Sequence, residues 1–168
     1  ICTLRGQAAV AATKATVQSV RLRPENPPAR AEVIEAVTDA DVLVLGPGSW
    51  FTSVIPHLLV PELAETIINT KAKRVLVLNV APAAETDGFS ASRHVELLAE
   101  HAPRLRLDVV IADERFAASD RHLENYVSSL GGTLYRADVA MPDGSARHDP
   151  NRLAAAFSEL LDRDLGRS

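Results

Sequence analysis

The strongest constraint on this chain is a regular alternation between short apolar runs and amphipathic stretches of helical length. Residues 42–45 and 75–80 are almost continuous runs of valine and leucine, and residues 109–112 and 133–139 are two more β-compatible runs. Strands that are apolar throughout are typical of parallel sheets covered by helices on both faces. The alternation therefore predicts an α/β protein with a Rossmann-like, doubly wound and mostly parallel sheet.

Helical signals occupy the segments between these runs. Residues 29–38 and 58–69 place apolar side chains at helical spacing. Residues 90–101 begin with a serine that can cap a helix, and residues 119–130 end at a Gly-Gly pair of the kind that commonly stops one. Each predicted strand after the first is therefore preceded by a predicted helix.

The two ends of the chain are predicted to differ. Residues 8–12 and 17–22 are short β-compatible runs separated by residues 13–16, and this pattern predicts an N-terminal β-hairpin. At the other end, Asp149 is placed to cap a helix whose first residue is Pro150. The apolar stripe of this last helix consists of Leu153, Phe157, Leu160 and Leu161.

Composition excludes several classes of protein. A length of 168 residues fits one domain, and a net charge of −4 provides no broad basic face for nucleic acid. The single cysteine, Cys2, excludes an internal disulfide and a cysteine-based zinc cluster, and it suits a reducing compartment. No apolar run approaches the roughly 20 residues that span a bilayer, and the first residues lack the basic segment followed by an apolar stretch that is typical of a secretory signal. We therefore expect a cytoplasmic protein without a membrane span.

The strongest local motif follows the first predicted strand. It consists of Gly46, Pro47, Gly48 and Ser49. Glycines let the backbone approach a phosphate, and Ser49, Thr52 and Ser53 add hydroxyl donors. The motif is neither a dinucleotide fingerprint nor a Walker loop. A tight strand-to-helix turn without a ligand is the alternative interpretation.

The second motif lies in the loop after the next strand. Its polar residues are Asn79, Glu85, Thr86 and Asp87. Because the carboxyl ends of parallel strands meet at one edge of the sheet, this loop is predicted to lie beside the glycine turn. Carboxylates and hydroxyls there suit a ribose, a metal-bound phosphate or a reacting hydroxyl. The alternative is that Asp87 and Gly88 merely form a turn.

The third motif is Arg147, His148, Asp149 and Pro150 at the start of the last helix. An arginine, a histidine and free backbone N–H groups at a helix N-terminus can all bind one anion. In the alternative interpretation, Asp149 caps the helix while Arg147 and His148 are solvated. The remaining histidines lack metal-ligand spacing, so no metal site and no assembled catalytic group is predicted.

Together the three motifs resemble the YvcK family of gluconeogenesis factors, which belongs with the CofD-like proteins. The long segment from Gly46 to Pro61 resembles the family's Gly-Pro-Gly-Ser motif and its Leu-Leu-Val-Pro continuation. Residues 85–89 resemble the Glu-Thr-Asp-Gly-aromatic motif, and residues 147–150 resemble the Arg-His-Asp-Pro motif. The order of the motifs along the chain also agrees with the family.

The resemblance implies a CofD-like fold and a regulatory protein that binds a nucleotide sugar, UDP-N-acetylglucosamine above all, or a dinucleotide such as NAD(P). It implies links to growth on gluconeogenic carbon sources, cell shape and peptidoglycan precursor supply. The ligand-binding residues would be Gly46, Pro47, Gly48, Ser49, Thr52, Ser53, Asn79, Glu85, Thr86, Asp87, Arg147 and His148. A small-molecule nucleotide is the expected partner, and a homo-oligomer is compatible with this assignment.

One departure bears on domain organisation. Members of the family begin with a strand and a Gly-Gly-Gly-Thr-Gly loop, which does not occur in this sequence. Residues 1–168 therefore correspond to the C-terminal part of a single CofD-like domain. The alternative function is a CofD-like 2-phospho-L-lactate transferase of coenzyme F420 biosynthesis. Trp50 and Phe51 favour the binder, because the transferases carry smaller or polar residues there to admit a deazaflavin.

Overall fold

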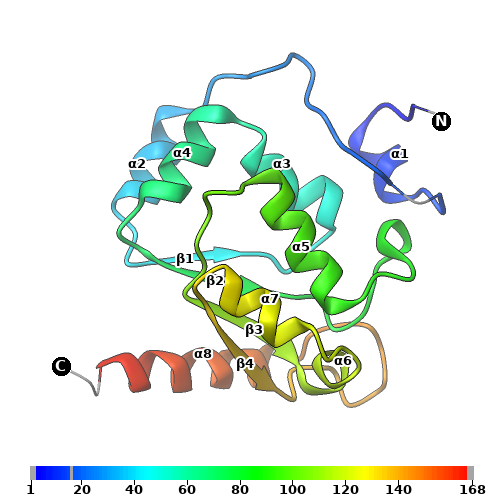
Figure 1. Ribbon diagram of the computed structural model, residues 1–168, viewed down its shortest axis with the longest axis vertical. Helices are drawn as coiled ribbons and strands as arrows, with labels where there is room; N and C mark the ends of the chain where they lie inside the picture. Colours follow the sequence, from blue (N-terminus) through cyan, green and yellow to red (C-terminus); the bar gives the residue numbers. More distant parts are fainter. Residues whose placement is uncertain (1–2, 16, 166–168) are drawn as a thin grey trace.

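A parallel β-sheet with helices on both faces forms the centre of the protein, as the computed structural model shows for residues 3–15 and 17–165 (Figure 1). Cys2 and Thr16, which belong to the predictions above, lie outside the described residues. The four strands lie in the order β1-β2-β3-β4, and all neighbours are parallel. Their bounds are β1 Val42–Leu45, β2 Lys73–Val77, β3 Val109–Asp113 and β4 Thr133–Ala137. The predicted α/β fold is confirmed.

Two strands end earlier than predicted, and side chains explain both ends. β2 ends at Val77 rather than at residue 80, because Asn79 directs its side-chain amide to a neighbouring loop. β4 ends at Ala137 rather than at residue 139. There the backbone N–H groups of Val139 and Ala140 donate to the Asp113 carboxylate instead of to a strand.

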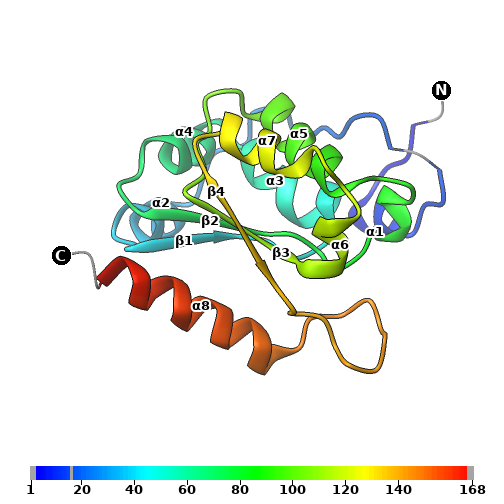
Figure 2. The ribbon, with the colours of Figure 1, turned by 60° about the horizontal axis from the view of Figure 1, so that its bottom comes forward.

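Each face of the sheet is covered by a different set of helices, as Figure 2 shows. Helices α2, α4, α5 and α7 cover one face, where Leu76 and Val110 belong to the larger apolar core. Among the described residues, helix α8 is the one helix under the other face, where Val75, Val77 and Ile111 belong to a smaller core. The alternation of side chains along each strand produces this division.

The predicted helices are present, and three of them, those predicted at residues 29–38, 58–69 and 119–130, are shorter or divided. The helices are α1 Gln7–Ala11, α2 Ala31–Thr38, α3 Ile55–Leu58, α4 Pro61–Asn69, α5 Ala91–His101, α6 Glu114–Ala118, α7 Leu123–Ser129 and α8 Pro150–Leu165, with a π-helical turn η1 at Trp50–Val54 and a 3₁₀ turn η2 at Ala84–Thr86. The helix predicted at residues 58–69 is divided because Pro61 starts α4. Helix α7 starts at Leu123 because Asp120 forms a turn with the backbone N–H of His122.

Both helix starts assigned from sequence are confirmed. The Ser90 hydroxyl accepts a hydrogen bond from the Arg93 backbone N–H at 3.2 Å at the start of α5. At the start of α8, Asp149 Oδ1 accepts from the Asn151 backbone N–H at 2.9 Å. In α8, Leu153, Phe157 and Leu160 pack against the smaller core, whereas Leu161 is 41% exposed.

The predicted N-terminal hairpin is wrong. Residues 7–11 form helix α1, and residues 17–22 form no strand. Alanine, which fills much of the first run, has the highest helix propensity of all residues. Val17 and Val20 pack against the larger core without a strand partner, so burial rather than sheet pairing accounts for their apolar character.

No single helix within the described ranges is long and apolar enough to cross a membrane. Residues 50–58 and 61–69 reach the required length and composition only together, and the two segments are bent by 78°.

Candidate functional site

The backbone of the glycine turn after β1 passes very close to the end of β2. Gly46 has a φ of +74°, and a Cβ placed there would lie 2.6 Å from the backbone oxygen of Val77. Only glycine accepts both conditions without strain. The following Gly46–Pro47 peptide bond is cis. The first glycine of the motif is therefore required by the sheet itself.

Gly48 is joined to the second loop through Asn79. The Gly48 backbone N–H donates to Asn79 Oδ1 at 3.0 Å, and Asn79 Nδ2 donates to the Gly48 carbonyl at 2.9 Å. The register of β1 on β2 pairs Leu45 with Leu76, so Gly48 and Asn79 stand opposite each other three residues further along each segment. This side-chain amide thus occupies the backbone groups of Gly48.

A buried carboxylate joins the same two loops a second time. Glu85 is 2% exposed, and its Oε1 and Oε2 accept hydrogen bonds from the Ser49 hydroxyl at 2.6 and 2.8 Å. Oε1 also accepts from the Phe51 backbone N–H at 3.3 Å, and Ser49 Oγ contacts Thr52 Oγ1. The structure therefore brings Ser49, Thr52 and Glu85 together.

The rest of the acidic loop divides into buried and exposed residues. Thr86 is fully buried, and its hydroxyl accepts from the Ala83 backbone N–H at 3.0 Å. Asp87 is exposed, as is Ser53 in η1. Thr86 is thus held within the protein interior, whereas the Asp87 carboxylate faces solvent.

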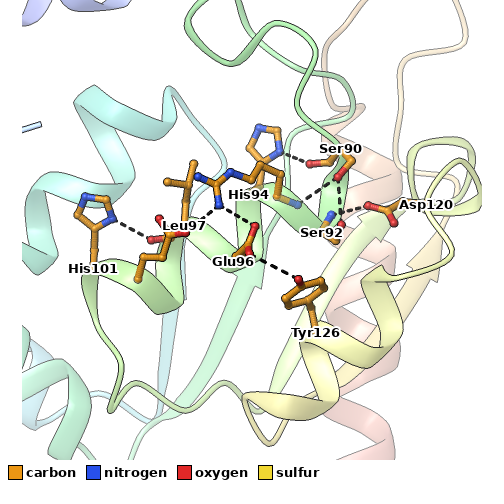
Figure 3. A network of polar contacts seen from close by, with 10 residues as sticks. Ser90, Ser92, His94, Glu96, Leu97, His101, Asp120 and Tyr126 are labelled. Carbon is orange, nitrogen blue, oxygen red and sulfur yellow. Dashed lines mark hydrogen bonds and ion pairs between the residues drawn. The ribbon is translucent and has the colours of Figure 1, made fainter. Parts of the chain in front are cut away.

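The acidic loop leads into helix α5, and a network of polar contacts holds the start of that helix (Figure 3). Ser90 and Ser92 contact each other through their hydroxyls, and Asp120 Oδ2 accepts from the Ser92 backbone N–H at 2.7 Å. Burial raises the pKa of Asp120, but hydrogen bonds from Ser92, His122 and Ser90 outweigh it and lower the pKa to about 2. The ionised Asp120 therefore fixes the start of α5.

His94 packs beneath both loops. Its ring is 1% exposed and lies edge-on to Trp50, Phe89 and Phe116, with centroid distances of 5.1, 5.7 and 6.0 Å. His94 Nδ1 donates to the Ser90 carbonyl at 2.8 Å, since a carbonyl only accepts. Burial lowers the pKa of His94 despite that bond and the nearby charge of Glu85. His94 is therefore a packing residue.

The third motif reaches the same edge through His148. Its Nε2 donates to the Leu78 carbonyl at 3.1 Å, immediately before Asn79. Burial lowers the pKa of His148, although the Leu78 bond and the Asp113 charge oppose the shift. Arg147 is exposed, and its guanidinium makes no hydrogen bond within residues 3–15 and 17–165. The structure therefore does not bring Arg147 into contact with the glycine turn.

Sequence reasoning missed one residue at this edge. Asp113 ends β3, is 2% exposed, and accepts backbone hydrogen bonds from Arg115, Val139 and Ala140. It fixes the path of the chain after β4 and thereby the position of the third motif. Its position at the carboxyl end of a buried strand was the available signal.

The cavity beside the glycine turn is small. A cavity of about 210 Å³ lies beside the turn, lined by Gly46, Ser53 and His57 together with apolar side chains of α2, β1 and α4. Ligand pockets commonly measure about 300–1,000 Å³. In the part of the chain that the structure describes, no group of three His, Cys, Asp or Glu residues is placed to hold a metal ion.

Comparison with known proteins identifies the family. A family model described as 2-phospho-L-lactate transferase CofD matches residues 2–149. The chain belongs to the CofD family. A relative from Mycobacterium tuberculosis, named a candidate gluconeogenesis factor, is 47% identical over 169 residues, which cover 98% of this chain and 49% of the relative. A relative of the same name from Deinococcus radiodurans is 36% identical, and the match covers 95% of this chain and 37% of that relative.

A solved structure agrees with both the fold and the family. The crystal structure of a member of the UPF0052 family from Bacillus halodurans has a TM-score of 0.76 and 27% sequence identity, and the match covers 91% of this chain and 54% of that one. The resemblance to YvcK-like gluconeogenesis factors is thereby confirmed. The CofD-family chain described here spans about half the length of the Mycobacterium relative and of the Bacillus protein.

Proposed function

We propose that this CofD-family chain forms one side of a nucleotide-binding site in a gluconeogenesis factor. The observation that carries the proposal is the double connection between the two loops, through Gly48 and Asn79 and through Ser49 and Glu85. These contacts hold backbone and hydroxyl groups together at the carboxyl edge of a parallel sheet, where α/β proteins bind nucleotides.

The proposed ligand is UDP-N-acetylglucosamine, with a dinucleotide such as NAD(P) as the other candidate. Arg147 would supply positive charge to the diphosphate, since it is exposed and its guanidinium makes no hydrogen bond within the described ranges. His148 and Asp87 would line the same edge. The names of the relatives support a regulatory role in carbon metabolism. We extend this proposal to cell shape, peptidoglycan precursor supply and a cytoplasmic location.

The second candidate function is that of a 2-phospho-L-lactate transferase, which the description of the matched family model favours. Trp50 and Phe51 bear on the choice. Both rings are fully buried, and their bulk fills the interior beneath the glycine turn. A substrate with a large planar ring would need that space, so we favour the regulatory binder.

Calorimetric titration tests the proposed function. We expect a full-length protein that contains this chain to bind UDP-N-acetylglucosamine at one site and Arg147→Ala to weaken that binding. The matched control is Arg121→Ala, which also removes an exposed arginine but lies on the turn before α7. Absence of binding to UDP-N-acetylglucosamine and NAD, or equal loss in both variants, would contradict the assignment. Turnover of the ligand, followed by phosphorus NMR, would favour the transferase.

A further inference from the structure

The hydroxyl groups of Ser49 in the glycine turn and of Thr52 in η1 have a fixed direction of hydrogen bonding. A carboxylate only accepts hydrogen bonds, so the single hydroxyl proton of Ser49 is donated to Glu85. Ser49 then has no proton left for its contact with Thr52, and Thr52 must be the donor in that pair. The hydrogen bonds therefore run from Thr52 to Ser49 to Glu85.

This direction determines what the turn offers to a ligand. The Thr52 proton is used within the protein and Thr52 is partly exposed, so its Oγ1 can offer a ligand only lone pairs. The Gly48 backbone N–H is likewise used by Asn79. The negative charge of Glu85 lies directly behind Ser49. A phosphate, which is anionic and only accepts, finds neither a donor nor a favourable charge at these groups.

We infer that Thr52 accepts a hydrogen bond from a neutral hydroxyl group of the ligand, with Ser49 and Glu85 as the positioning residues that keep it an acceptor. The inference deepens the proposed function, on which it rests for the identity of the ligand. A ribose and a hexose both carry such hydroxyls. The diphosphate is then recognised elsewhere on the edge, outside the Ser49–Thr52 pair.

Isosteric variants test the role of Thr52 in binding. Thr52→Val removes the acceptor, and Thr52→Ser keeps it. Thr66→Val is the matched control, because the Thr66 hydroxyl donates to the Glu62 carbonyl within α4. We expect Thr52→Val to weaken binding of UDP-N-acetylglucosamine roughly 3- to 10-fold, the effect of one neutral hydrogen bond. Thr52→Ser and Thr66→Val should stay within twofold of the parent.

The choice of probe separates hydroxyl from phosphate recognition. Pyrophosphate affinity should be the same in Thr52→Val and in the parent, whereas UDP affinity should fall only if the ribose supplies the hydroxyl. A loss confined to UDP-N-acetylglucosamine assigns the hydroxyl to the hexose. An equal loss with pyrophosphate, or no loss with any probe, would overturn the inference.

If the parent binds no nucleotide, that result refutes the proposed function but not this inference. A second measurement then tests the inference by itself. Backbone amide resonances of residues 49–53 are followed by NMR while N-acetylglucosamine, ribose or inorganic phosphate is added. The inference requires that a neutral sugar shifts these resonances in the parent and not in Thr52→Val. Shifts with phosphate only, or with none of the three, would overturn it.

Discussion

Replacing Gly46 by alanine tests whether the glycine turn is required by the sheet. Gly46 combines a positive φ of +74° with a Cβ position only 2.6 Å from the Val77 backbone oxygen. Gly144 is a matched control, since its φ is +78° and nothing lies within 4 Å of its Cβ position. The two substitutions therefore share the conformational cost and differ only in the close contact.

The expected magnitudes follow from these two terms. A left-handed conformation costs an alanine roughly 1–2 kcal/mol, and the loss of unfolded-state freedom returns about 0.4–1 kcal/mol in both variants. Gly144→Ala should therefore reduce the free energy of unfolding by about 1 kcal/mol. Forcing a methyl group against backbone in a packed region adds about 1–3 kcal/mol. Gly46→Ala should thus lose about 2–4 kcal/mol.

Urea unfolding followed by tryptophan fluorescence measures both values. The single tryptophan, Trp50, is fully buried next to the turn, so its emission reports unfolding. With a denaturant dependence of about 2 kcal/mol per molar urea, the midpoint of Gly46→Ala should lie roughly 0.5–1.5 M below that of Gly144→Ala. Midpoints that agree within about 0.2 M would refute the close-contact argument.

Three further predictions concern charged and titratable groups. Arg147→Ala should weaken binding of UDP-N-acetylglucosamine roughly 10- to 150-fold in calorimetry, because a lost charge-assisted hydrogen bond costs about 1.5–3 kcal/mol. Asp149→Ala should instead lower the melting temperature, since it removes the cap of α8. Because burial lowers the pKa of His94, the unfolded chain binds a proton at higher pH than the folded chain does. The free energy of unfolding should therefore fall as the pH drops below 6.5, and it should fall less steeply in His94→Gln. Denaturant titrations of the parent and the variant across this pH range measure the difference. The pKa of Asp120 falls from 3.8 to about 2 on folding, so ionised Asp120 contributes about 2 kcal/mol to the free energy of unfolding above pH 3.8, and this contribution is lost as the pH falls to about 2. In denaturant melts, Asp120→Asn should be less stable than the parent at pH 7 and equally stable near pH 2.

Local signals in the sequence were sufficient for the sheet and for the helix starts. The valine and leucine runs at residues 42–45 and 109–112 specify buried parallel strands, and Ser90 and Asp149 specify caps, because each signal acts within a few residues. The hairpin prediction failed because residues 17–22 are apolar for another reason, since Val17 and Val20 pack on the core.

The arrangement of the candidate site was harder to predict. Glu85 was assigned to the ligand from its motif, but its bond to Ser49 joins residues separated by 36 positions, and no periodicity encodes such a contact. Likewise, Thr52 was expected to add a donor, whereas the Glu85 carboxylate makes it an acceptor. The direction of hydrogen bonding depends on tertiary neighbours, which the sequence alone does not reveal.

The pairing of Gly48 with Asn79 has a consequence for substitutions at position 79. A carboxamide presents a donor and an acceptor in one plane, as a peptide group does, so the Asn79 side chain imitates one more rung of the β1–β2 ladder after the strands themselves have ended. Aspartate has the same shape but lacks the donor, and leucine has neither group. Position 79 therefore requires a side chain that offers both a hydrogen-bond donor and an acceptor, as a backbone peptide group does.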